Sequence, residues 1–349
     1  MSKENNVVEI VPGFHQIKVP VPLKGLGSVF VYLVQSGGHN LLIDTAWDDE
    51  ESYIALKNGL ESLGVSTHDI QKIVISHLHP DHFGLSGRLK KESPNASVMI
   101  HRMDANSLRD TSEKFEQFLK QLHDWIRVHG APESDVTLMM ESSTPMMNFV
   151  APARPDIELI GGELIRVGDQ FQFQVISTPG HTIGNLCLYE TAGTQLLFSG
   201  DHVLPKITPN VSLTPLYEGG DPLADYLKSL ELLRSLKVSR VLPSHEYIFS
   251  DLPKRINEIE EHHKERLQDT INALAVNDGG DALSAYDVSS RLHWYTGAWA
   301  KLSPWEKRAA LMETLAHLEY LKRRGRVAEI EEFDGDLKRK VLFSNIEKC

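Results

Sequence analysis

Four potential metal ligands lie within six positions of this chain: His77, His79, Asp81 and His82. They follow residues 72–76, a run rich in β-branched side chains that predicts a short strand. Imidazole and carboxylate groups are common ligands of divalent metals. The chain holds 16 histidines among 349 residues, so three in one such window indicate a shared role. Pro80 is expected to stiffen this loop and Gly84 to permit a tight turn.

Three further potential ligands also follow predicted strands: His181 after residues 171–177, Asp201 after residues 195–198, and His245 after residues 240–242. Loops that leave strand ends can present side chains to one cleft at little ordering cost, because the sheet holds both ends of each loop. The sequence therefore predicts that all seven side chains converge on one metal site.

The first window resembles the HxHxDH motif of the metallo-β-lactamase superfamily, and the later ligands follow in the order that the family shows. Residues 178–182 (Thr-Pro-Gly-His-Thr) and 200–204 (Gly-Asp-His-Val-Leu) are most similar to its glyoxalase II-like branch. The resemblance spans about residues 7–250. It implies an α+β fold, the four-layer αββα sandwich in which two sheets pack face to face with helices outside.

The resemblance also implies two divalent metal ions, with zinc as the default and iron or manganese as alternatives. Carried over by motif, the first ion would be held by His77, His79 and His181. The second would be held by Asp81, His82 and His245, and Asp201 would bridge the two. Two such ions share a hydroxide formed from a water whose pKa falls to about 7. Asp81 would additionally be catalytic by orienting this hydroxide. Asp44, at the end of an early strand, would steady a ligand or loop.

Hydrolysis of a small carbonyl ester, a thioester or a lactone, is the leading functional hypothesis. An insert at about residues 103–150 has helical spacing and a Met-rich end formed by Met139, Met140, Met146, Met147 and Phe149. It is expected either to cap an apolar substrate pocket or to pack as ordinary core. No basic cluster follows the last ligand, which departs from the glutathione-binding pattern of glyoxalase II.

Two domains are expected, a catalytic domain over residues 1–252 that carries the insert and a helical domain over residues 253–349. Ser303-Pro304-Trp305-Glu306 has the N-cap serine, proline and glutamate of a helix start, and Gly325 marks the end of that helix. Residues 327–333 and 337–343 then predict a hairpin. This order resembles the winged-helix domain of lactamase-β-like proteins, some of which are endoribonucleases.

Two other classes of function stay open. A phosphodiesterase or endoribonuclease would use basic residues of the C-terminal domain to hold RNA: Lys322, Arg323, Arg324, Arg326, Lys338, Arg339 and Lys340. Acidic side chains share that hairpin, so a solvated face of mixed charge is the simpler interpretation. An interaction protein with a vestigial site would instead use leucines 311, 315, 318 and 321 to contact a partner, with a homodimer as one form.

The formal net charge of -12 argues against broad affinity for nucleic acid, so a small-molecule substrate is the expected partner. No stretch approaches the roughly 18 apolar residues of a membrane span. The N-terminus has neither the basic start nor the apolar core of a signal peptide, so a cytoplasmic location is expected. Cys187 and Cys349 are too few for a disulfide framework.

Overall fold

The computed structural model describes residues 6–22, 27–108, 113–142, 153–217, 219–275, 282–334 and 337–346. Its contacts divide the chain into two units. The first, here called the sandwich unit, consists of residues 1–109, 146–209 and 229–255. The second, here called the helical unit, consists of residues 110–145, 210–228 and 256–349. Residues 110–145, expected as a cap on the catalytic domain, thus group with the C-terminal segment.

The sandwich unit is built on two sheets. The larger has seven strands in the order β1 (Val7–Val11), β2 (Phe14–Pro20), β3 (Ser28–Ser36), β4 (His39–Ile43), β5 (Lys72–Val74), β6 (Ser97–His101) and β7 (Ile157–Leu159). The smaller has the order β12 (Arg240–Pro243), β11 (Leu196–Gly200), β10 (Leu186–Glu190), β9 (Phe171–Ser177) and β8 (Leu164–Val167). Neighbours pair antiparallel, except that β4 to β7 and the pair β11 and β12 are parallel. The mixed sheets are those of the predicted α+β fold.

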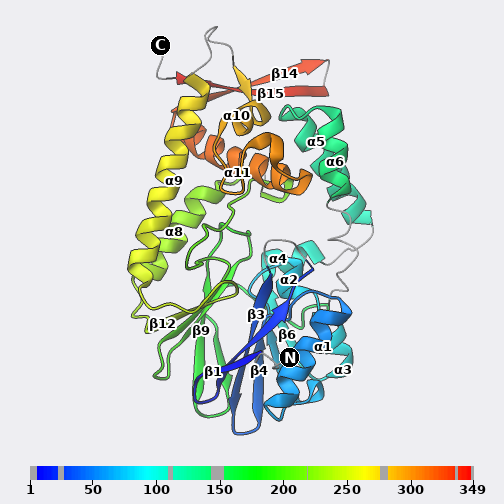
Figure 1. Cartoon of the computed structure of the whole chain (residues 1–349), viewed down its shortest axis with the longest axis vertical. Helices are drawn as coiled ribbons and strands as arrows, with labels where there is room; N and C mark the ends of the chain where they lie inside the picture. Colours follow the sequence, from blue (N-terminus) through cyan, green and yellow to red (C-terminus); the bar gives the residue numbers. More distant parts are fainter. Residues whose placement is uncertain are drawn as a thin grey trace. The chain divides into compact units, whose positions relative to one another are not determined.

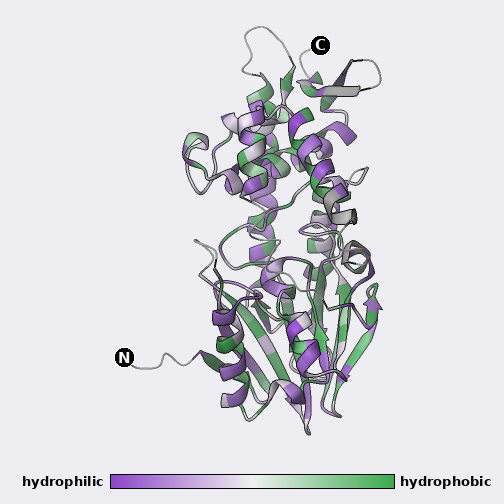
Figure 2. Cartoon of the chain, turned by 90° about the vertical axis from the view of Figure 1, so that its right-hand side faces the viewer, coloured by the Kyte–Doolittle hydropathy of each residue, from purple (hydrophilic) through white to green (hydrophobic). Residues whose placement is uncertain are grey.

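Apolar side chains fill the layers around these sheets. Between the sheets, Phe14 lies 6.1 Å from Phe173 and 6.3 Å from Phe198, measured between ring centroids. On the outer face of the larger sheet, a second cluster includes Leu60 of α1 (Glu50–Ser62) and Leu89 of α3 (Ser86–Glu92). Figure 1 shows both helices beside this sheet, and Figure 2 shows many hydrophobic residues along the strands of the sandwich unit. The predicted αββα sandwich is confirmed.

Most of the helical unit consists of helices and a small sheet. Its helices include α5 (Glu113–Val128), α6 (Glu133–Glu141), α10 (Ala285–Arg291) and α11 (Pro304–Arg323), while α8 (Pro222–Arg234) and α9 (Leu252–Ala275) belong to both units. Its three strands have the order β13 (Leu283–Ser284), β15 (Leu337–Asn345) and β14 (Val327–Asp334). Short 3-10 helices, η2 (Pro215–Tyr217) and η3 (Trp299–Lys301), complete it. Both the hairpin of β14 with β15 and its position after α11 agree with the sequence prediction.

Helix α11 begins as its sequence predicts. The Ser303 side chain accepts a hydrogen bond from the Glu306 N–H, and the Glu306 carboxylate accepts one from the Ser303 N–H. This reciprocal pair satisfies two amide donors that the first turn leaves free. At the other end, Gly325 has a φ of 67°, the left-handed conformation that favours glycine after a helix.

Some elements differ from the prediction. The sequence pattern predicts a strand over residues 162–167, but β8 begins at Leu164, because Gly161 and Gly162 both have a φ of 97° and interrupt the extended backbone. Helical spacing is visible over residues 53–63, but α1 already begins at Glu50, where Asp49 caps it by accepting a hydrogen bond from Ser52 N. Met139 of α6 is buried, whereas Met146, Met147, Phe149 and Cys349 lie outside the described residues.

Among the helices that the structure describes, none is long and apolar enough to cross a bilayer.

Candidate metal centre

Parallel pairing brings the ends of the ligand-bearing strands to one edge. Ile43 of β4 lies opposite Val74 of β5, so Asp44 and the loop after β5 leave the larger sheet side by side. In the smaller sheet, Gly200 of β11 lies opposite Pro243 of β12, which sets Asp201 and His245 next to each other. The loop between β9 and β10 leaves from the same edge. All loops named from the sequence therefore meet here.

The loop after β5 enters a short helix, α2 (Pro80–Phe83), whose N-cap position is His79. Pro80 fits the first helical position because that residue has no intrahelical amide bond to lose. Gly84 has a φ of -50°, so the turn expected from it is not left-handed. It is required for another reason: a Cβ there would lie 2.5 Å from Pro80 O and 2.7 Å from Ala46 O.

The first three-ligand group is formed by His77, His79 and His181, whose ligand atoms all lie within 4.8 Å of one another. His79 Nδ1 lies 2.9 Å from His77 Nε2 and 3.1 Å from His181 Nε2. The three ring nitrogens thus point at a common space. His77 is fully buried, while His79 and His181 are only partly buried.

A second group is formed by Asp81, His82 and His245, again with ligand atoms within 4.8 Å. Asp81 Oδ2 lies 3.3 Å from His245 Nε2 and 3.6 Å from His82 Nε2. The other nitrogen of His245, Nδ1, lies 3.0 Å from the backbone oxygen of Ser28. This contact fixes the ring so that Nε2 faces the group.

Asp201 lies between the two groups. Its Oδ2 is 3.5 Å from His82 Nε2 and 3.9 Å from His181 Nε2, and its Oδ1 is 3.4 Å from His245 Nε2. One carboxylate therefore contacts ligands of both groups, the position that a bridging ligand requires.

Asp44 supports the site from behind. Its Oδ2 lies 2.8 Å from His82 Nδ1 and accepts hydrogen bonds from the hydroxyls of Ser76 and Ser244. Its Oδ1 accepts a hydrogen bond from Ser76 N at 2.7 Å. The residue has a φ of 63°, a conformation that Asp tolerates better than most side chains. The contact with Asp44 directs His82 Nε2 toward the metal group.

The two groups differ electrostatically. Burial and the neighbouring imidazoles lower the pKa of His77 and of His79, so both rings are neutral at physiological pH. Burial would also lower the pKa of His245, but Asp201 and Asp81 outweigh it and raise the pKa to about 10. Burial would raise the pKa of Asp201, but His245 and His82 outweigh it and hold this pKa well below its usual range. Without metal, the protonated His245 and the ionised Asp201 thus carry opposite charges. A bound cation would take the place of the proton on the imidazole.

Three buried atoms of the site lack a hydrogen-bond partner within the described part of the chain: His82 Nε2, His245 Nε2 and Asp201 Oδ1. Leaving such atoms without a partner is costly in a folded protein. All three face the space between the groups, and imidazole nitrogen with carboxylate oxygen is a donor set that suits zinc, iron and manganese. The residues present therefore fit a pair of divalent cations.

Two other histidines stand near the ligands in the sequence pattern, His101 after the strand that ends at Ile100 and His202 next to Asp201. His101 ends β6 and bonds within the protein, with Nδ1 accepting from Met103 N and Nε2 lying 3.3 Å from Ser177 Oγ. Burial lowers the pKa of His202 to about 3, and the ring is fully buried. Neither belongs to a three-ligand group found among the described residues.

Sequence inspection missed the serines that precede two ligands, Ser76 before His77 and Ser244 before His245. Both donate to Asp44, and a serine directly before a histidine at a strand end is the signal that could have identified them.

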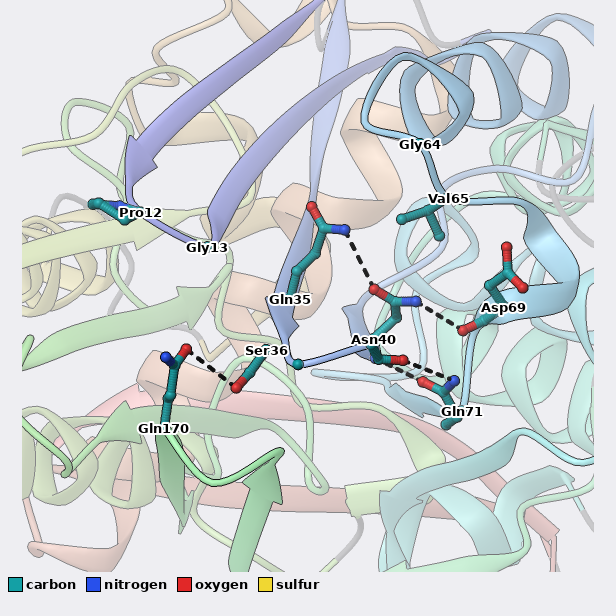
Figure 3. Close-up of a pocket in the computed structure, with 12 residues that line it drawn as sticks. Pro12, Gly13, Gln35, Ser36, Asn40, Gly64, Val65, Asp69, Gln71 and Gln170 are labelled. Atoms are coloured by element: carbon teal, nitrogen blue, oxygen red, sulfur yellow. Dashed lines mark hydrogen bonds between the residues drawn. The ribbon is translucent and has the colours of Figure 1, made fainter.

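A surface pocket lies at the opposite end of the larger sheet, beside the turn between β3 and β4 (Figure 3). Its polar side chains bond mainly to one another. The Asn40 N–H donates to Gln71 Oε1 at 2.6 Å, and Ser36 Oγ donates to Gln170 Oε1 at 3.2 Å. These contacts brace the turn between β3 and β4.

The family model described as the metallo-beta-lactamase superfamily matches residues 25–245, which include every ligand named above. The chain belongs to this superfamily. It is a hydrolase of the metallo-beta-lactamase fold, as its sequence predicts.

Individual relatives agree with this superfamily assignment. The chain is 25% identical over 298 residues to a beta-lactamase-like protein 2 homolog of Caenorhabditis elegans, spanning 85% of this chain and 78% of that protein. It is 35% identical to a hydroxyacylglutathione hydrolase of Nitrosococcus oceani, but only over 98 residues, 28% of this chain and 35% of that one. A crystal structure of a metallo-beta-lactamase family protein from Thermus thermophilus is similar with a TM-score of 0.78 and 29% identity, over 97% of this chain and 100% of that one. The likeness to glyoxalase II-like proteins is thus partial.

Proposed function

We propose that the chain hydrolyses a small carbonyl ester, a thioester or a lactone, using two divalent cations held by the seven side chains of the metal centre. The observation that carries the proposal is the position of Asp201. Its carboxylate lies within 3.9 Å of ring nitrogens from both three-ligand groups and so joins them into one site. Zinc is the default cation.

When bound, two divalent cations polarise the attacked oxygen and lower the pKa of a water molecule toward neutrality. The side chains of this protein supply position. Asp81 Oδ2 faces the same space as His245 Nε2, at 3.3 Å, so its carboxylate can accept a hydrogen bond from the attacking water and orient it. Asp44 and the backbone oxygen of Ser28 hold the rings of His82 and His245 in place.

An endoribonuclease is the competing hypothesis, and the ion pairs of the helical unit weigh against it. Lys322 Nζ lies 2.9 Å from Glu329 Oε2, and Arg323 Nε lies 2.7 Å from Glu319 Oε1. Arg324 pairs with Asp221 at 3.0 Å. Because carboxylates within the same unit already neutralise these cations, they are poorly suited to hold a phosphate backbone.

The winged-helix character of the C-terminal domain is part of the proposal. The order of elements supports it: a helix, a short strand, two helices and then a hairpin, α9-β13-α10-α11-β14-β15. The short strand β13 pairs with β15, which adds a third strand to the hairpin.

The test is an assay of purified protein on acyl thioesters, lactones and phosphodiesters, with metal content measured by elemental analysis. We expect hydrolysis of a thioester or lactone, loss of activity on chelation, and recovery on adding Zn²⁺, Fe²⁺ or Mn²⁺. Cleavage of phosphodiesters alone would reject a carbonyl substrate.

A pair of variants tests the role of Asp81. Asp81→Ala is expected to lower kcat by about 10²-fold or more. Asp156→Asn is the control, because this carboxylate bonds to Val98 N and Lys90 at the opposite end of the parallel strands. Unchanged turnover in Asp81→Ala would instead favour an interaction protein with a vestigial site.

A further inference from the structure

A buried carboxylate outside the metal centre connects the two loops that carry its first group. Asp104 lies in α4 (Arg102–Leu108), the short helix after β6, and is 2% exposed. No lysine or arginine pairs with it within the described ranges of the chain. Burial raises the pKa of Asp104 to about 7, and a buried carboxyl group without a cationic partner depends on hydrogen-bond donors.

Those donors come from two separate loops. The Leu78 N–H and the Gly184 N–H both donate to the Asp104 carboxylate. The Thr182 hydroxyl also lies near this carboxylate, although Thr182 Oγ1 and Asp104 Oδ2 form no hydrogen bond among the residues that the structure describes.

The residues that contact Asp104 are neighbours of the metal ligands in the sequence. Leu78 stands between His77 and His79, and Thr182 directly follows His181. One loop leaves β5 of the larger sheet, while the other joins β9 to β10 of the smaller sheet. Asp104 therefore holds together loops from different sheets that supply all three ligands of the first group.

Close packing shows that this contact tolerates little displacement. A Cβ added at Gly184 would lie 2.3 Å from Asp104 Oδ1 and 2.9 Å from Asp104 N. Only a glycine lets the second loop approach the carboxylate so closely. The loop is further fixed on itself, since Thr182 O accepts hydrogen bonds from Gly180 N and Asn185 N.

We infer that Asp104 is a positioning residue that sets the distance between the two loops and thereby the cation affinity of the first group. This inference rests on the proposed metal centre. Residues that orient ligands without touching the cation typically change metal affinity about 10- to 100-fold when replaced, because ligand geometry relaxes.

The test compares Asp104→Asn with wild type in titrations with Co²⁺ alone, followed by the electronic spectrum of the bound ion and by competition with a chelator. The asparagine keeps the shape of the side chain but replaces one carboxylate oxygen by an NH₂ group, which cannot accept a hydrogen bond from either loop. We expect the Kd for the first Co²⁺ to rise by about 10- to 100-fold and the spectrum to change.

Glu190→Gln is the matched control. Glu190 is also fully buried and accepts hydrogen bonds from the backbone of Ala192 and Thr194, at the end of β10 away from the ligand loops. Its replacement should lower the melting temperature of the metal-free protein and leave Co²⁺ binding unchanged. A purely structural role for Asp104 predicts the same result for both variants.

Wild-type Kd and spectrum in a folded Asp104→Asn variant would overturn the inference. If that variant does not fold, Gly184→Ala decides, since its added methyl group would lie 2.3 Å from Asp104 Oδ1 and should weaken Co²⁺ binding about 10-fold by moving the second loop, and unchanged binding would overturn the inference. A wild-type protein that binds no Co²⁺ would instead refute the proposed function itself.

Discussion

Gly84→Ala should damage both stability and the second metal group. A methyl group at this position would lie 2.5 Å from Pro80 O, 2.6 Å from Asp48 N and 2.7 Å from Ala46 O. Carbon atoms pack at about 3.5 Å from their neighbours, so the overlap with Pro80 O is about 1 Å. All three neighbours are backbone atoms, which cannot turn aside as a side chain can.

The cost follows from that overlap. Overpacking typically destabilises by about 1–3 kcal/mol, and a clash with three backbone atoms belongs at the upper end. Replacing a glycine by alanine where the backbone suits both returns about 1 kcal/mol at most, which leaves a net loss of about 2 kcal/mol. Asp81 and His82 lie in the adjacent helix α2 and would move with it. Because ligands have to be held within about 0.5 Å, metal affinity should fall as well.

Urea unfolding of the metal-free protein and a Co²⁺ titration measure the two effects. Gly59→Ala is the control, since Gly59 lies in α1 and its nearest neighbours are side-chain atoms of Ile17 and Val7, which can adjust. Gly59→Ala should leave Co²⁺ affinity unchanged. If Gly84→Ala matched wild type in both stability and affinity, the close approach of α2 to residues 46–48 would not be what places the second group.

Three further outcomes are expected. Asp44→Asn should weaken metal binding about 10- to 100-fold in a Co²⁺ titration, because an amide either loses the Ser76 N–H or forces the wrong tautomer on His82. Burial raises the pKa of Glu313 to about 6 from 4.5. Its contribution to stability is therefore full below about pH 4.5 and lost as the pH rises through about 6. Between these two pH values, the free energy of unfolding of Glu313→Gln should therefore rise by about 2 kcal/mol relative to that of wild type, as measured by urea titrations. Ser303→Ala should cost about 1 kcal/mol in thermal unfolding without changing metal content.

The ligands could be predicted from sequence because each is tied to a local pattern. His77 to His82 form one contiguous motif, and His181, Asp201 and His245 each follow a strand with clear hydrophobic character. Their convergence then follows from how strand ends meet at one edge of the sandwich. The start of α11 was equally predictable, since its capping residues act on their own backbone.

Features that depend on long-range contact could not be predicted. Asp104 lies in a helix without a motif, and its partners Leu78 and Gly184 bond to it through backbone groups that any residue type carries. The role of Gly84 was assigned to a turn, whereas the structure shows that it allows a close approach between two backbone segments. Residues 110–145 group with the C-terminal segment through tertiary packing, which helical periodicity does not encode.

The ligands of the proposed site lie as far apart in sequence as residues 77 and 245. In an unfolded chain, only the ligands at residues 77–82 stay close together. A cation therefore binds the native state much more tightly than the unfolded state. At a free concentration about 100 times its Kd, such a ligand adds about 2.7 kcal/mol to the free energy of unfolding. Metal scarcity would then enlarge the unfolded fraction that proteases degrade, so that the abundance of this protein would follow its metal supply.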